Sequence, residues 1–149
     1  MASALTTSLE RLTALITTAA AATGFPVEID RPTPYRESDL PLVLVSTGEI
    51  RATPQSAQTW ARNWTYSPYV EIVASGATPE AARTAVNTAL SAFIDSLEVQ
   101  LEANRRAVEQ EPLLASGTYP EINGMPFEVQ GNSRARGYVL EIDLEFLRG

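Results

Sequence analysis

The chain contains no cysteine, no histidine and no lysine among its 149 residues. Without cysteine and histidine there is no disulfide framework, thiol nucleophile, Ser-His-Asp triad or histidine general base. The absence of lysine excludes Schiff-base chemistry and the lysine of a nucleotide-binding P-loop. Carboxylates, tyrosine and arginine are the catalytic side chains that remain, so the catalytic inventory of the chain is poor.

Positive charge is also scarce. Eleven arginines against 18 acidic residues give a net charge of −7 and a pI near 4.6. Tight binding along a phosphate backbone or to an anionic membrane surface requires clustered cations, so we expect neither specific nucleic-acid binding nor membrane binding. With 44% hydrophobic residues and no long linker, residues 1–149 are expected to form a single soluble domain.

An apolar run at residues 12–22 (LTALITTAAAA) is similar to the hydrophobic region of a signal peptide. The positively charged start of a signal peptide is missing, since only Arg11 precedes the run and it follows Glu10. A helical spacing of three and four residues relates Leu5, Leu9, Leu12 and Ile16. The sequence therefore predicts an amphipathic helix that ends near Gly24.

Short strands are predicted on either side of a proline-rich loop. Residues 25–29 alternate weakly, and 31–39 form the loop. Residues 40–46 (LPLVLVS) predict a strand, with Pro41 restricted to its start or to a sheet edge. The polar residues 47–57 predict a mobile connection.

Large side chains share one parity from residue 60 to residue 74, which predicts one long strand or two strands that meet at a bend. Pro68 cannot donate to a ladder and predicts a bulge, an edge or that bend, with a hairpin at residues 66–68 as an alternative. Trp60, Trp64 and Tyr66 would then share a face. They are interpreted as core or subunit-interface residues, with an aromatic platform for bases or sugars as the alternative.

The clearest helix start is Thr78-Pro79-Glu80, with Thr78 as the N-cap and Pro79 in the first turn. Apolar residues then keep a helical period, and the helix is expected to end between residues 101 and 109. They are Ala82, Val86, Leu90, Phe93, Ile94, Leu97 and Leu101.

The C-terminal part ends in the strongest period-two pattern of the chain. Residues 113–125 predict a loop, 126–130 a short strand and 131–137 a flexible basic turn. From residue 138 to residue 146 apolar and acidic residues alternate strictly. The expected fold is α+β: a mostly antiparallel sheet with an N-terminal helix and one long central helix packed on one face.

The alternation places Glu141, Asp143 and Glu145 on the sheet face away from the helices, about 6.5 to 7 Å apart. A solvated strand face that resists aggregation is the favoured interpretation. The alternatives are a divalent-cation or acid–base site, and the lining of a pore that repels DNA phosphate. No metal or cofactor site is predicted.

Arginine pairs on presumed loops or helix ends are too few for a nucleic-acid groove, but they could form salt bridges to an acidic neighbouring subunit. The candidate interface or pore residues are therefore Trp60, Arg62, Trp64, Arg105, Arg106, Arg134, Arg136, Glu141, Asp143 and Glu145.

The order of these features resembles the tail terminator (tail completion) proteins of long-tailed bacteriophages and related tail-derived particles. The features are the leading helix, the Leu40-Pro41 entry to a hydrophobic strand, the aromatic strand, the Thr78-Pro79-Glu80 helix, a Gly/Pro loop and a last strand that ends Leu144-Glu145-Phe146. The resemblance covers nearly the whole chain.

This resemblance implies a non-catalytic subunit of a hexameric ring at the head-proximal end of a virion tail, assembled in the cytoplasm of a bacterial host. The implied partners are further copies of the chain, the tail tube protein and a head completion or neck protein, and DNA passes through the ring. The alternatives are another head-to-tail joining protein, a binding module of an injection machine, or a small carboxylate-based enzyme or ligand-binding domain.

Overall fold

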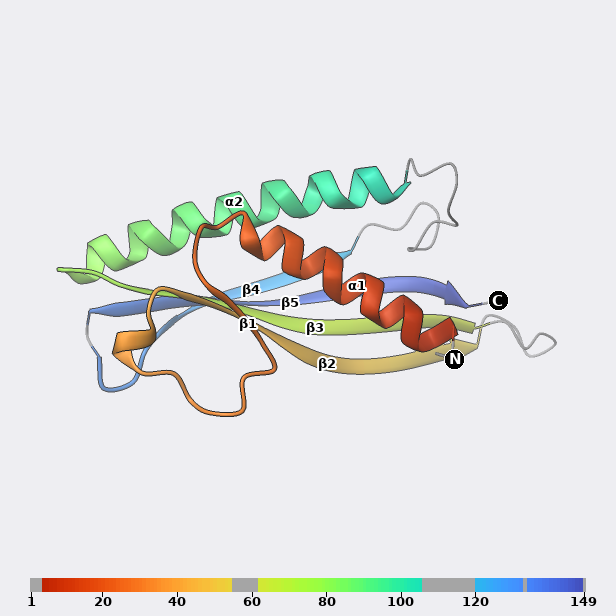
Figure 1. Ribbon diagram of the computed structural model, residues 1–149, viewed down its shortest axis with the longest axis horizontal. Helices are drawn as coiled ribbons and strands as arrows, with labels where there is room; N and C mark the ends of the chain where they lie inside the picture. Colours follow the sequence, from red (N-terminus) through yellow and green to blue (C-terminus); the bar gives the residue numbers. More distant parts are fainter. Residues whose placement is uncertain (1–3, 55–61, 106–119, 133, 149) are drawn as a thin grey trace.

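The computed structural model describes residues 4–54, 62–105, 120–132 and 134–148, with side chains at 9–51, 64–103, 120–132 and 134–145 (Figure 1). Its elements are α1 (Ala4–Ala21), β1 (Val27–Ile29), η1 (Glu37–Asp39), β2 (Leu42–Pro54), β3 (Arg62–Ser75), α2 (Pro79–Arg105), β4 (Glu121–Glu128) and β5 (Ala135–Arg148). This is the predicted α+β fold. None of the helices in these ranges is long and apolar enough to cross a bilayer.

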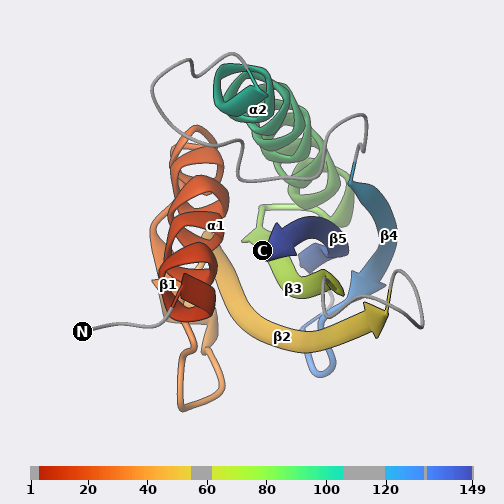
Figure 2. The same cartoon turned by 90° about the vertical axis from the view of Figure 1, so that its right-hand side faces the viewer.

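The five strands form one sheet in the order β1-β2-β3-β5-β4. Only the short β1–β2 pair is parallel, and the other three pairs are antiparallel. Both helices lie on one side of this sheet and contact each other (Figure 2). Neither α1 nor α2 lies on the other side, and the long strands β3 and β5 lie at the centre.

The two helices form where their caps and spacings predict. Leu12 and Ile16 of α1 are fully buried, and the helix ends at Ala21, just before Gly24 takes a positive φ of 78°. At the start of α2 the Thr78 hydroxyl accepts a hydrogen bond from the Ala81 amide at 3.1 Å, as an N-cap does.

The core lies between the helices and the inward-facing side chains of the sheet. Both helices and the strands β2, β3 and β5 contribute to it, and Phe93 of α2 is its largest buried ring besides Tyr66. Even-numbered residues between 138 and 144 of β5 point into this core, as the alternation predicts. They include Leu140, Ile142 and Leu144.

β2 is longer than predicted, because residues 47–54 continue the strand instead of forming a mobile connection. The sequence conceals this continuation because the register between β2 and β3 shifts between Ser46 and Glu49. Such a bulge breaks the alternation of side chains on which the prediction depended. A Cβ on Gly48 would overlap the Ser67 carbonyl, so the close approach at the bulge requires glycine.

The same irregularity explains Pro68. β3 is one continuous strand and not a hairpin. Pro68 lies opposite the bulge of β2, and it also has no paired residue in β5. A residue without an amide hydrogen fits such an interruption of the ladder.

Two further boundaries were predicted wrongly. β4 starts at Glu121, inside the predicted loop, and includes Gly124. The turn before β5 is shorter than predicted, because Ala135 and Arg136 already belong to the last strand. Gly124 is accepted in β4 because the side chains of Tyr138 and Leu140 occupy the space above it.

Candidate assembly surfaces

The predicted acidic stripe lies on the sheet face that no helix covers, here called the open face. Glu141, Asp143 and Glu145 are all half-buried there. Register places Glu121 of β4 opposite Asp143, and Glu49 of β2 opposite Ser67 of β3. On the strands, the carboxylates of the open face are Glu28, Glu49, Glu71, Glu121, Glu141, Asp143 and Glu145, and Arg51 lies on the same face.

One of these carboxylates is held by the neighbouring strand. The buried Ser67 hydroxyl donates a hydrogen bond of 2.6 Å to Oδ1 of Asp143. This bond links β3 to β5 at the point where Pro68 and the bulge interrupt the backbone ladder. The described residues contain no group of three His, Cys, Asp or Glu side chains that could hold a metal ion.

The end of the open face that lies farther from Glu145 is covered by the segment between β1 and β2. Burial raises the pKa of Tyr35 in this segment, and the nearby Glu71 carboxylate raises it further. Burial also raises the pKa of Glu71. Leu42 and Val73, which point to the open face, are buried at this end. The exposed carboxylates Glu49 and Glu121 lie toward the other end of the face.

Two of the aromatic candidates, Trp64 and Tyr66, lie on the helix-covered side. Tyr66 is buried, and its hydroxyl lies 3.4 Å from the Thr13 hydroxyl of α1. Trp64 is half-buried and packs against the core. Tyr66 is therefore a core residue and Trp64 packs against the core, whereas a role of Trp64 at a subunit interface or in stacking stays a prediction. Trp60 lies outside the described residues.

Side chains are described for two of the arginine candidates, Arg134 and Arg136. Arg136 lies in β5, its guanidinium 3.6 Å from the Glu128 carboxylate of β4, whereas Arg134 is exposed in the preceding turn. Arg62 begins β3 opposite Pro54, and Arg105 is the last described residue of α2, but their side chains are not described. Arg106 lies outside the described residues.

The sheet has two edges without a described strand partner, a feature that sequence reasoning missed. β4 is unpaired along its outer side, so residues 121–128 form the open β4 edge. On the other side β1 pairs only with Val43–Val45. Beyond it the Asp30 carboxylate accepts hydrogen bonds from the amide and hydroxyl of Thr47, at 2.7 and 2.6 Å. Residues 48–54 then form the open β2 edge.

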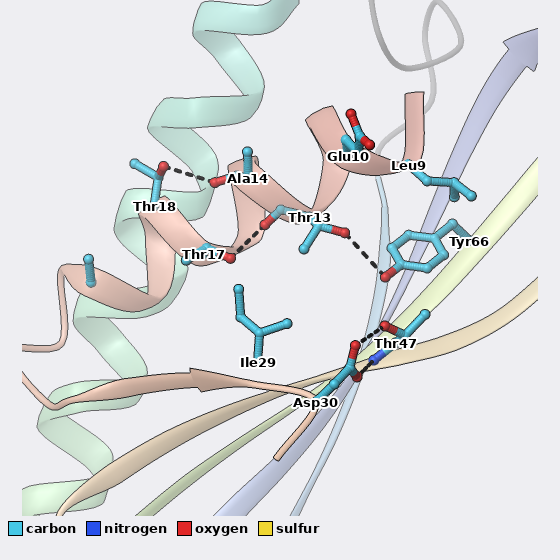
Figure 3. Close-up of a pocket in the computed structure, with 11 residues that line it drawn as sticks. Leu9, Glu10, Thr13, Ala14, Thr17, Thr18, Ile29, Asp30, Thr47 and Tyr66 are labelled. Atoms are coloured by element: carbon cyan, nitrogen blue, oxygen red, sulfur yellow. Dashed lines mark hydrogen bonds between the residues drawn. The ribbon is translucent and has the colours of Figure 1, made fainter. Parts of the chain in front are cut away.

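A groove of about 820 Å³ adjoins the open β2 edge beneath α1 (Figure 3). It is lined by Leu9, Thr13, Ala14 and Thr17 of α1, with Ile29, Thr47 and Tyr66 below them. The threonine hydroxyls of α1 are occupied, since Thr17 donates to the Thr13 carbonyl at 2.8 Å and Thr13 contacts Tyr66. The lining is therefore mainly apolar.

No protein-family model matches the sequence, and no curated protein matches it. Among solved structures, the chain is similar to one described as "Virion of native gene transfer agent (GTA) particle", with 17% sequence identity and a TM-score of 0.46. The alignment covers 87% of this chain and 84% of that chain.

Proposed function

We propose that the chain is a structural subunit of a phage-like virion, and that copies of it form a ring, expected to be a hexamer, at the end of a tail tube. The ring ends tube polymerisation and offers the surface on which the head or neck is joined. The carrying observation is the order of elements, which follows the order on which the resemblance to tail terminators is based. The role requires no catalytic residue and no cofactor.

Capping follows from how repeating contacts propagate. A ring that uses the docking surface of a tube subunit on one side, and a different surface on the other, stops the polymer because the head-to-tail contact cannot repeat. The acidic end of the open face suits a lumen through which DNA passes, since carboxylates repel phosphate and do not retain it.

The decisive experiment is deletion of the gene in a strain that produces the particle, followed by negative-stain measurement of tail lengths. We expect overgrown tubes that the wild-type gene restores to a uniform length. Tubes of normal length without heads would contradict the terminator role and identify a neck protein. Tails and heads that are unchanged would overturn both.

The purified protein gives an independent test. Light scattering after size exclusion, across a hundredfold range of concentration, should give a mass near six protomers, with annular particles in negative stain. A carboxylate-based enzyme or metal-binding domain predicts instead that Mg²⁺ or Ca²⁺ raises the melting temperature of the parent but not that of the Glu141→Gln, Glu145→Gln double variant. We expect that neither ion changes the melting temperature of the parent or of the double variant.

A further inference from the structure

The sheet ends in two open edges that match each other in direction. β2 and β5 run one way along the sheet, and β3 and β4 run the other way, because each neighbouring pair among them is antiparallel. If the sheet continued into a second copy, β4 of that copy would meet β2 in antiparallel orientation. The junction would therefore continue the dominant pairing of the sheet.

The two edges also match in length and in the space available to them. The open β4 edge has eight residues. β1 occupies Val43–Val45, and Asp30 occupies Thr47, so an incoming strand can pair only with residues 48–54. An incoming β4 must therefore be displaced along β2, and such a stagger is what a closed arrangement of strands requires.

Apolar side chains meet on the correct side of such a junction. Ile122 pairs with Ile142, and Ile50 pairs with Tyr66, so both isoleucines face the helix-covered side of the sheet. Both are exposed in the single chain, by 37% and 38% respectively. In a continued sheet they lie on the side of the junction that also contains the apolar groove beneath α1. The two exposed isoleucines and the groove beneath α1 would be covered together.

We propose that the open β4 edge of one copy pairs with the open β2 edge of the next, so that the sheet continues from subunit to subunit. The inference depends on the proposed function, because it names the surfaces by which the ring closes. Each copy uses one edge as donor and the other as acceptor, which is a head-to-tail contact that can close into a ring. It leaves no strand edge of the described sheet unpaired except around β1.

Disulfide trapping tests the proposal directly, because the natural chain has no cysteine. Within one copy β2 and β4 are separated by β3 and β5, so their Cα atoms lie roughly 14 Å apart, beyond the reach of a disulfide. Arg51→Cys combined with Asn123→Cys, and Arg51→Cys combined with Met125→Cys, sample two registers on the open face. A disulfide in either variant joins two copies.

After mild oxidation we expect at least one of these variants to give a ladder of covalent oligomers that ends at the ring size and collapses on reduction. The matched control is Val99→Cys combined with Asn123→Cys, because Val99 is also exposed, at 64%, but lies on α2. A ladder as strong in this control would overturn the proposal. So would the absence of a ladder from both test variants, which is also the result if another protein occupies the β2 edge.

A second variant tests the apolar junction without oxidation. Ile122→Lys introduces a charge where the neighbour would bury it, and edge lysines oppose strand addition. We expect the concentration for half-assembly to rise about tenfold or more, whereas Val99→Lys should leave it unchanged. Equal effects would contradict the junction. Ring-sized particles without the disulfide ladder overturn the edge pairing alone, whereas a ladder of open chains without rings supports it and contradicts the ring function.

Discussion

The two faces of the sheet are made by alternate residues of the same strands, but one face is buried against the helices and the other carries charge. On the helix-covered face Val70, Ile72 and Ile142 are fully buried against α1 and α2. On the open face their immediate neighbours Tyr69 and Glu71 remain exposed or half-buried. One face therefore supplies most of the burial that stabilises the fold, and the other can carry charge without being optimised for packing.

The largest expected effect comes from removing a core ring on the covered side. Phe93 is fully buried, and Phe93→Ala should lower the free energy of unfolding by about 3 to 5 kcal/mol through lost burial and the cavity that remains. Val99→Ala on the exposed side of the same helix should change it by less than about 0.5 kcal/mol. Urea denaturation at neutral pH measures both. Similar losses in the two variants would mean that the faces do not differ in stability as the structure implies.

The second effect concerns the bulge in β2, where the side chains that face the helices change from odd-numbered to even-numbered residues. Val43 and Val45 face the helices before the bulge, and Ile50 does so after it, so the bulge changes which parity is covered. Gly48→Ala forces a Cβ onto the Ser67 carbonyl and should cost about 1 to 3 kcal/mol. Amide hydrogen exchange should accelerate in residues 48–54. Unchanged exchange there would show that the bulge tolerates a side chain.

The sequence predicted those parts of the fold in which one pattern continues without interruption. The strict alternation of the last strand placed Glu141 and Asp143 on the open face, and the Thr78 N-cap placed the start of α2. The second half of β2 was missed because the bulge at Gly48 breaks the alternation. The first part of β4, residues 121–125, was missed because it is exposed on both faces and contains Gly124, so it has no hydrophobic period.

The candidate surfaces show the same division. A face can be predicted from alternation within one strand, so the acidic stripe was found. An open edge depends on which strands are neighbours and on where the short β1 stops, and this information lies in pairing between distant segments. The groove beneath α1 likewise joins Leu9, Ile29 and Tyr66, which no local pattern relates.

A smaller effect is expected on the open face, from the hydrogen bond between Ser67 and Asp143. Ser67→Ala removes the buried hydroxyl that donates to the Asp143 carboxylate, and this should lower the free energy of unfolding by roughly 1.5 kcal/mol. Ser91→Ala, on the exposed side of α2, is the control and should cost less than about 0.5 kcal/mol. Chemical denaturation of the two variants in parallel gives the difference. A negligible loss for Ser67→Ala would indicate that water replaces the hydroxyl.

The smallest effect distinguishes two carboxylates by the sign of their pH dependence. Burial raises the pKa of Glu71, so its ionisation is harder in the folded than in the unfolded chain. At low pH the carboxyl group is neutral in both states and does not destabilise the fold. Stability is lost as the pH rises through the raised pKa, because the buried group must then ionise. Glu71→Gln should therefore raise the melting temperature at neutral pH, by about 1 to 2 °C, and this gain should vanish near pH 4.

Asp30 provides the opposite case, because hydrogen bonds from the hydroxyl and then the amide of Thr47 lower its pKa. Its ionised form stabilises the fold above the ordinary pKa of an aspartate, and that contribution is lost as the pH falls through the lowered pKa. Asp30→Asn should consequently lower the melting temperature at neutral pH, and the deficit should shrink as the solution is acidified. Thermal unfolding of the parent and both variants from neutral to acidic pH measures the two slopes. A loss of stability at neutral pH in both variants would contradict the burial of Glu71, and a gain in both would contradict the stabilising hydrogen bonds from Thr47 to Asp30.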